Sequence, residues 1–191
     1  MSPILGARGG LSASAYGFTS AVAAAAASYE SIATTTVGAG GSSTITFSSI
    51  LGSYQHLQLR FIAAASTTLP TMYLRLNSDS GANYVRHRLQ GNGTSASSGV
   101  NTGETATYMF GSAGISAAPI FRASVLDIVD YSSTNKYKTL RALDGGDSNG
   151  SGVMEILSNL WMNTAAITSI TLTLDLGNFT QYSSFALYGI K

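Results

Sequence analysis

The chain has 191 residues, of which 10% are charged and 45% are hydrophobic, and its formal net charge is +1. This balance argues against nucleic acid as the main partner, because phosphate binding needs clustered Lys and Arg side chains. The absence of cysteine excludes disulfides, thiol nucleophiles and thiolate metal sites, and no apolar run reaches the ~18 residues of a membrane-spanning helix.

The first 28 residues differ in composition from the rest and consist almost entirely of Ala, Gly and Ser. We expect an extended N-terminal arm over 1–28 and a β body over 29–191. A short Ala helix over 21–27, capped by Ser20, would be too short to be stable alone in water. A linker without fixed structure and an arm that docks on a neighbouring subunit both fit this composition. The docking arm would use five anchors: Leu5, Arg8, Leu11, Tyr16 and Phe18.

After the arm, short stretches of alternating apolar and polar residues run to the end of the chain. The expected strands are 44–47, 57–61, 72–76, 84–89, 105–110, 120–130, 135–143, 153–161, 167–176 and 185–190. In the clearest of these, 167–176, one face carries Ile170, Leu172, Leu174 and Leu176. We expect 90–103 to be a long Gly/Ser/Asn loop. About ten short strands without a long helical period predict an all-β, antiparallel β-sandwich or jelly roll.

The segments 72–76 and 84–89, joined by the turn-rich stretch 77–83, give the strongest hairpin signal in the chain. Adjacent strands of a hairpin place side chains of one face about 5 Å apart. The hairpin and the strand before it would therefore place six side chains on one face of the sheet: Arg60, Tyr73, Arg75, Tyr84, Arg86 and Arg88. Tyr and Arg are enriched in protein interfaces. This face is a candidate interface or glycan-binding surface, with a solvated sheet face as the alternative.

Metal-binding patterns are weak in this sequence. Neither His56 nor His87 has a carboxylate within a few residues, whereas a metal site needs several converging ligands. Asp144 and Glu155 are spaced like the first and twelfth positions of a calcium loop, but glycine and serine stand where oxygen ligands are needed between them. We therefore expect a simple hairpin loop there, no metal site and no cofactor.

Signals for catalysis are equally weak. The chain lacks a Gly-x-Ser-x-Gly motif followed by an acid and a histidine. A glycosidase needs two acids about 5–9 Å apart. Asp127 and Asp130 would point to opposite faces of a strand, and Asp127 could meet Glu155 only if their strands paired. Trp161 lies in a strongly apolar strand, so we expect it in the core rather than in a sugar-binding groove. We expect a non-enzymatic protein.

Six segments carry a resemblance to small virion proteins of tailed bacteriophages, many of them cyanophage or marine. They are GARGGLSASAYG (6–17), YESIA (29–33), HLQLR (56–60), NSDSGANY (77–84), DYSSTNKYK (130–138) and FALYGIK (185–191). The resemblance covers nearly the whole chain. Many of these proteins carry proline after the strand where this chain has Ile50, Leu51 and Gly52, a departure that affects only the local turn.

The resemblance implies a structural component on the outer surface of a phage particle. Its arm would dock on other virion proteins of the tail, baseplate or capsid, and its β body would project outward as a homotrimer. The first expectation is a tail-associated fibre or receptor-binding protein, with a host surface glycan as a further partner. A capsid decoration protein that stabilises the head is the close alternative. A carbohydrate-binding or glycan-degrading tail module is the distant one.

Overall fold

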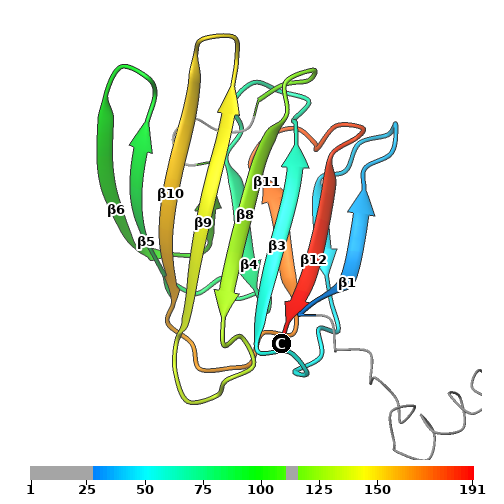
Figure 1. Cartoon of the computed structure of the whole chain (residues 1–191), viewed down its shortest axis with the longest axis vertical. Helices are drawn as coiled ribbons and strands as arrows, with labels where there is room; N and C mark the ends of the chain where they lie inside the picture. Colours follow the sequence, from blue (N-terminus) through cyan, green and yellow to red (C-terminus); the bar gives the residue numbers. More distant parts are fainter. Residues whose placement is uncertain (1–27, 111–115) are drawn as a thin grey trace, which may run out of the picture.

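Two antiparallel β-sheets, one of eight strands and one of four, form the two layers of the protein (Figure 1). The computed structural model describes residues 28–110 and 116–191, and within these ranges it contains twelve strands and no α-helix. The all-β, antiparallel sandwich predicted from the sequence is confirmed, with two strands more than the ten expected. None of the described segments is a helix long and apolar enough to cross a membrane.

Neighbouring strands are antiparallel throughout both sheets. The large sheet runs β1 (Tyr29–Thr36), β12 (Ser184–Ile190), β3 (His56–Ala63), β8 (Arg122–Val129), β9 (Lys138–Asp147), β10 (Gly152–Trp161), β5 (Tyr84–Gly91) and β6 (Ala96–Glu104). The small sheet runs β2 (Thr44–Phe47), β11 (Ile170–Leu174), β4 (Met72–Leu76) and β7 (Thr107–Met109). The small sheet lies behind the large one in Figure 1, so the large sheet has an inner face toward the core and an outer face toward solvent.

The core lies between the two sheets and is built from the alternating apolar positions of their strands. Phe61 of β3 packs against Phe110 and Phe185, with ring centroids 5.6 and 5.4 Å apart. Leu172, at the centre of β11, is fully buried as predicted, but Leu176 is 67% exposed. The expectation for Leu176 is wrong because the chain leaves the sheet after Leu174, turning at a glycine with positive φ.

Trp161 is fully buried, as predicted, and it fixes the connection between the two sheets. Its indole Nε1 donates a 2.7 Å hydrogen bond to Asp79 Oδ2, and its ring stacks on Tyr84 at a centroid distance of 6.5 Å. The Tyr84 hydroxyl accepts a hydrogen bond from the backbone N–H of Leu76. These contacts hold the stretch 77–83 as a bridge over the core.

The hairpin predicted from 72–76 and 84–89 is wrong. The first segment forms β4 of the small sheet and the second forms β5 of the large sheet, so the chain crosses from one layer to the other. Met72, Leu74 and Leu76 point into the core from one side, and Tyr84 points into it from the other. Because both segments bury their apolar face in the same core, they must lie on opposite sides of it rather than side by side.

The long loop predicted over 90–103 is also wrong, because most of it forms β6. Eight of its nine residues are exposed, and small polar residues give this strand no apolar alternation that sequence analysis could detect. Its backbone pairing with β5 defines it. The turn before it is closed by Asn92, whose Oδ1 accepts hydrogen bonds from the N–H groups of Thr94 and Ser95.

The predicted hairpin loop between Asp144 and Glu155 is confirmed with narrower bounds. β9 continues to Asp147 and β10 begins at Gly152, so four residues make the turn. Asn149 and Gly150 both have positive φ, which is typical of a tight Asn-Gly turn between antiparallel strands. The predicted arm anchors Leu5, Arg8, Leu11, Tyr16 and Phe18 and the Ala segment 21–27 lie outside the described residues.

Candidate functional site

The six residues predicted to form one Tyr/Arg face occupy three separate places, because β4 and β5 belong to different sheets. Arg60 lies on the outer face of the large sheet, Tyr73 and Arg75 on the outer face of the small sheet, and Tyr84, Arg86 and Arg88 on the inner side of β5. One contact joins two of the groups. Tyr73 packs on Tyr108 of β7 at 5.0 Å, and the Arg86 guanidinium lies over the same Tyr108 ring at 4.6 Å.

A cluster of charged and amide side chains occupies the inner face of the large sheet beside β5. Glu155 pairs in register with Asp144 on β9, and Asn159 pairs with Arg86 on β5. These four residues and Arg122 are at most 8% exposed. Gly146 leaves room for the Arg122 side chain, because a Cβ there would lie 2.5 Å from Arg122 Cγ. All five side chains are nearly closed to solvent, and Arg122 also lines a hollow with Asn92 and Ser148.

Burial controls the ionisation of this cluster. Removal from water raises the pKa of Asp144 to about 6, although the Ser124 hydroxyl and the Phe110 N–H both donate hydrogen bonds to its carboxylate. Burial also raises the pKa of Glu155, against the attraction of the nearby arginines. No residue of the described ranges donates a hydrogen bond to either Glu155 oxygen. The cluster therefore carries an ionisation penalty at neutral pH.

The structure separates one of the acid pairs considered from the sequence and brings the other together inside the sandwich. Asp127 lies on the outer face of β8 and accepts a 2.7 Å hydrogen bond from Gln58, whereas Glu155 is buried on the inner face of β10. Both strands pair with β9 and not with each other. Asp144 and Glu155 face one another inside the sandwich. Residues 28–110 and 116–191 contain no group of three His, Asp or Glu that could hold a metal.

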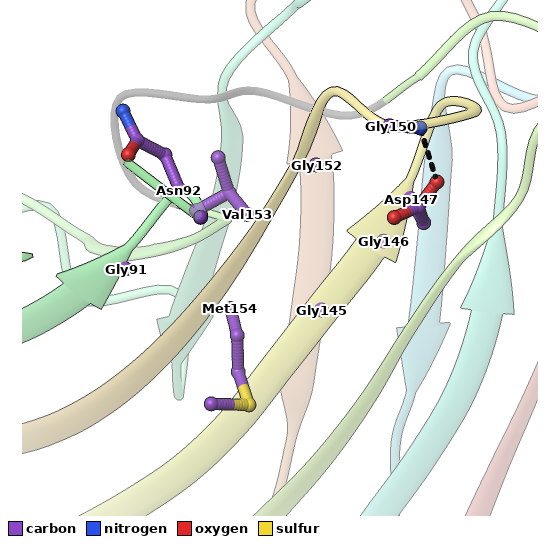
Figure 2. Close-up of a pocket in the computed structure, with 10 residues that line it drawn as sticks. Gly91, Asn92, Gly145, Gly146, Asp147, Gly150, Gly152, Val153 and Met154 are labelled. Atoms are coloured by element: carbon purple, nitrogen blue, oxygen red, sulfur yellow. Dashed lines mark hydrogen bonds between the residues drawn. The ribbon is translucent and has the colours of Figure 1, made fainter. Parts of the chain in front are cut away.

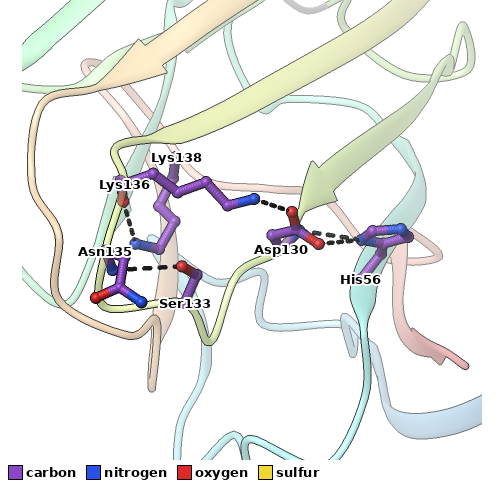
Figure 3. Close-up of polar contacts among 6 residues, drawn as sticks. All are labelled: His56, Asp130, Ser133, Asn135, Lys136 and Lys138. Atoms are coloured by element: carbon purple, nitrogen blue, oxygen red, sulfur yellow. Dashed lines mark hydrogen bonds and ion pairs between the residues drawn. The ribbon is translucent and has the colours of Figure 1, made fainter.

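A polar cluster at the start of β3 joins three segments of the chain (Figure 3). His56 Nδ1 accepts a 3.0 Å hydrogen bond from the backbone N–H of Asp130. Lys136 forms an ion pair with Asp130, and its hydrogen bond lowers the pKa of that carboxyl. The buried Lys138 Nζ donates hydrogen bonds to the carbonyls of Lys136 and Thr164 at 2.9 and 3.1 Å. These contacts hold the loop between β8 and β9 in place.

A shallow groove of about 530 Å³ lies between the β5–β6 turn and the β9–β10 hairpin (Figure 2). Six glycines line it: Gly91, Gly93, Gly145, Gly146, Gly150 and Gly152. Met154 lies along it, and Asp147 Oδ1 accepts a hydrogen bond from the N–H of Gly150 at its rim. Among the described residues that line the groove, Asp147 is the only titratable one, and most of the others are glycines.

The outer face of the large sheet carries a contiguous set of exposed apolar side chains, here named the exposed apolar band. Its members are Ile62, Leu89, Val125, Leu143, Met154 and Ile156, with exposed fractions between 37 and 61%. The strand register makes one row of Val125, Leu143, Ile156 and Leu89 across four neighbouring strands. Sequence analysis missed this band because its members come from separate segments, each of which also carries a buried apolar face.

An ordered Tyr/Arg cluster borders the exposed apolar band on β3. The Arg60 guanidinium lies over the rings of Tyr29 and Tyr188, at 5.6 and 5.5 Å from their centroids. Arg60 Nε also donates a hydrogen bond to Gln58, which in turn donates one to Asp127. Arg60 therefore lies beside tyrosines, as expected, but they are Tyr29 and Tyr188 rather than Tyr73 and Tyr84.

Comparisons with known proteins give little guidance. No family model matches the chain, and no curated protein matches its sequence. A solved structure of the alginate lyase Aly36B, a mutant in complex with an alginate tetrasaccharide, is similar over 85% of this chain and 95% of that chain. The TM-score is 0.35 and the sequence identity 11%. A likeness at this level carries no argument about what the chain does.

Proposed function

We propose that this chain is a non-enzymatic structural protein of a tailed-bacteriophage particle that assembles through the outer face of its eight-stranded sheet. The exposed apolar band carries the proposal. Its six large side chains adjoin one another on one sheet face, and all are at least 37% exposed. Soluble monomers rarely leave a contiguous apolar patch of this kind open, and such patches mark interaction sites.

The border of the band supports the same proposal. Arg60 is held between the rings of Tyr29 and Tyr188, and Tyr and Arg are enriched among the residues that contribute most to binding at interfaces. Because the guanidinium is already fixed by stacking and by its hydrogen bond to Gln58, little side-chain entropy would be lost on binding. The face combines an apolar centre with a pre-organised polar margin, as protein interfaces do.

The resemblance to small virion proteins is our reason for placing the proposed role in a phage particle. We take a tail-associated fibre or receptor-binding protein, docked through residues 1–28, as the first hypothesis. Immunogold labelling of intact particles with an antibody to the β body tests it. Label along the tail or baseplate is the expected result, whereas label spread over the head would contradict the fibre role and favour capsid decoration. Particles that carry no label would overturn the virion role itself.

The use of the sheet face is tested by incorporation of variants into particles. Ile156→Glu places a charge at the centre of the exposed apolar band, where an interface would bury it without a partner. We expect its incorporation to fall at least about 100-fold, since an uncompensated buried charge costs several kcal/mol and each ~1.4 kcal/mol is a factor of ten. Thr46→Glu is the matched control, at an exposed position of β2 on the small sheet, away from this face. Equal incorporation of both folded variants would contradict assembly through the band.

A further inference from the structure

We infer that the partner of the exposed apolar band is a second copy of this chain, packed face to face with the first about a two-fold axis. The inference rests on the proposed function, in which this face is an assembly interface, and it names the partner that covers the face. Three observations carry it: the relief of the face, its size, and its lack of charge.

The face has a ridge between two hollows. Met154 forms the ridge on β10, and its two cross-strand neighbours are Gly145 on β9 and Gly91 on β5. Because neither glycine has a side chain, the surface drops on both sides of the methionine. One hollow, of about 300 Å³, includes Val125 and Gly145, and the other, of about 210 Å³, includes Gly91 and the ridge itself.

A ridge beside a hollow fits a copy of itself. In a two-fold contact the same patch is used twice, so the Met154 ridge of each copy can enter a hollow of the other. Methionine is unbranched and polarisable, and it fills irregular gaps well. The glycines allow the approaching side chain to reach the backbone of the partner strand. The relief of the face is therefore self-complementary around Met154.

The size of the face matches one second copy. Strands lie about 4.8 Å apart and rise about 3.3 Å per residue, so eight strands of about eight residues make a face of roughly 1,000 Å². A stable interface of standard size buries about 800 Å² on each partner. A second sheet stacked about 10 Å away, as in β-sandwiches, would cover the whole exposed apolar band.

The charge of the face is compatible with self-association. No member of the exposed apolar band is charged, and the next row along the same strands carries both signs, with Asp127 in register with Arg141. Two copies brought together would therefore meet apolar surface with apolar surface, without a block of like charge between them. This pattern favours a second copy over a strongly charged partner.

Single cysteines test the contact directly, because the natural chain contains none. Ile156→Cys lies in the middle of the exposed apolar band, and Leu51→Cys, at a position 72% exposed in a loop outside the strands, is the matched control. Under mild oxidation we expect a disulfide-linked dimer from Ile156→Cys and none above background from Leu51→Cys. Equal cross-linking of both variants would contradict a contact through the band.

Light scattering on the full chain gives the stoichiometry. At about 0.1 mM, above the micromolar Kd of the weakest interfaces of this size, the expected mass is twice the 19.7 kDa of one chain. Ile156→Glu should give the mass of one chain with an unchanged circular dichroism spectrum, and Thr46→Glu, on the small sheet, should remain a dimer. The trimer that the resemblance implies would appear at three times the mass and would contradict the two-fold contact.

The two proposals fail in different ways. A wild-type chain that is monomeric at this concentration overturns the second copy as the partner. If Ile156→Glu still loses incorporation into particles in that case, assembly through the band stands and another virion protein covers it. A dimer that persists in folded Ile156→Glu also overturns the inference, because the contact then lies elsewhere on the molecule.

Discussion

Replacing Asp144 with asparagine is expected to stabilise this protein at neutral pH. The Asp144 carboxylate is 1% exposed and lies between β8 and β10 on the inner face of β9. Its two carboxylate oxygens accept hydrogen bonds from the Ser124 hydroxyl and from the backbone N–H of Phe110. An asparagine can accept from the Phe110 N–H through its amide oxygen and donate to the Ser124 oxygen through its amide nitrogen, which reverses the direction of the second hydrogen bond. The substitution therefore removes the buried charge and keeps the shape and the hydrogen bonds.

The magnitude follows from the pKa of Asp144. Burial raises that pKa from 3.8 to about 6, so between these values the folded state binds a proton that the unfolded state has released. The free energy of unfolding contributed by this group is therefore highest at low pH and falls as the pH rises through about 6. At pH 7.5 the ionised carboxylate costs the folded state about 3 kcal/mol, and at pH 5 it costs about half as much.

Urea unfolding at pH 5 and at pH 7.5, at one protein concentration, measures this effect. We expect the free energy of unfolding of Asp144→Asn to exceed that of the wild type by up to about 3 kcal/mol at pH 7.5 and by about half as much at pH 5. Glu155, whose pKa burial also raises, contributes in the same direction in both proteins. The exposed Asp147→Asn on the same hairpin is the control and should follow the wild type. A variant that loses stability at pH 7.5, or whose advantage does not shrink at pH 5, would refute the reasoning.

Two further substitutions test the packing of the sandwich. Leu172→Asp should abolish cooperative unfolding followed by circular dichroism, because it buries a charge in the centre of the small sheet, whereas Thr173→Asp on the other face of β11 should remain folded. Gly189→Ala should lower the free energy of unfolding in urea by about 1–3 kcal/mol, because its Cβ would lie 2.3 Å from the Tyr54 ring. Gly38→Ala, which meets open space, should change it by less than about 0.5 kcal/mol.

The strands that bury one regular apolar face could be predicted from the sequence. In β11, Ile170 and Leu172 alternate with threonines, and both are buried as expected. The end of the strand could not be predicted, because Leu176 continues the same alternation but lies beyond the last backbone pairing, next to Gly177 with its positive φ. Alternation reports which residues prefer the core, whereas pairing with a neighbour decides where the strand stops.

The partners of each strand were harder to predict than the strands themselves. The stretch from Asn77 to Asn83 has the composition of a turn, and a turn serves equally well in a hairpin or in a crossing between layers. Contacts made by the folded chain select the crossing. The Trp161 indole donates a hydrogen bond to Asp79, and the Tyr84 hydroxyl accepts one from the backbone N–H of Leu76. The Tyr/Arg face predicted from the hairpin separated into three groups for this reason alone.

The exposed apolar band shows why an assembly surface is difficult to find from one sequence. Val125, Leu143 and Ile156 each lie on the outer face of a strand whose inner face is buried, so these three strands carry large apolar side chains on both faces. Strands of that kind are expected where both faces of a sheet are covered. Within residues 28–110 and 116–191 only the inner face is covered, by the small sheet. The strand composition thus calls for a further layer on the outer face, which is the layer that we propose a second copy supplies.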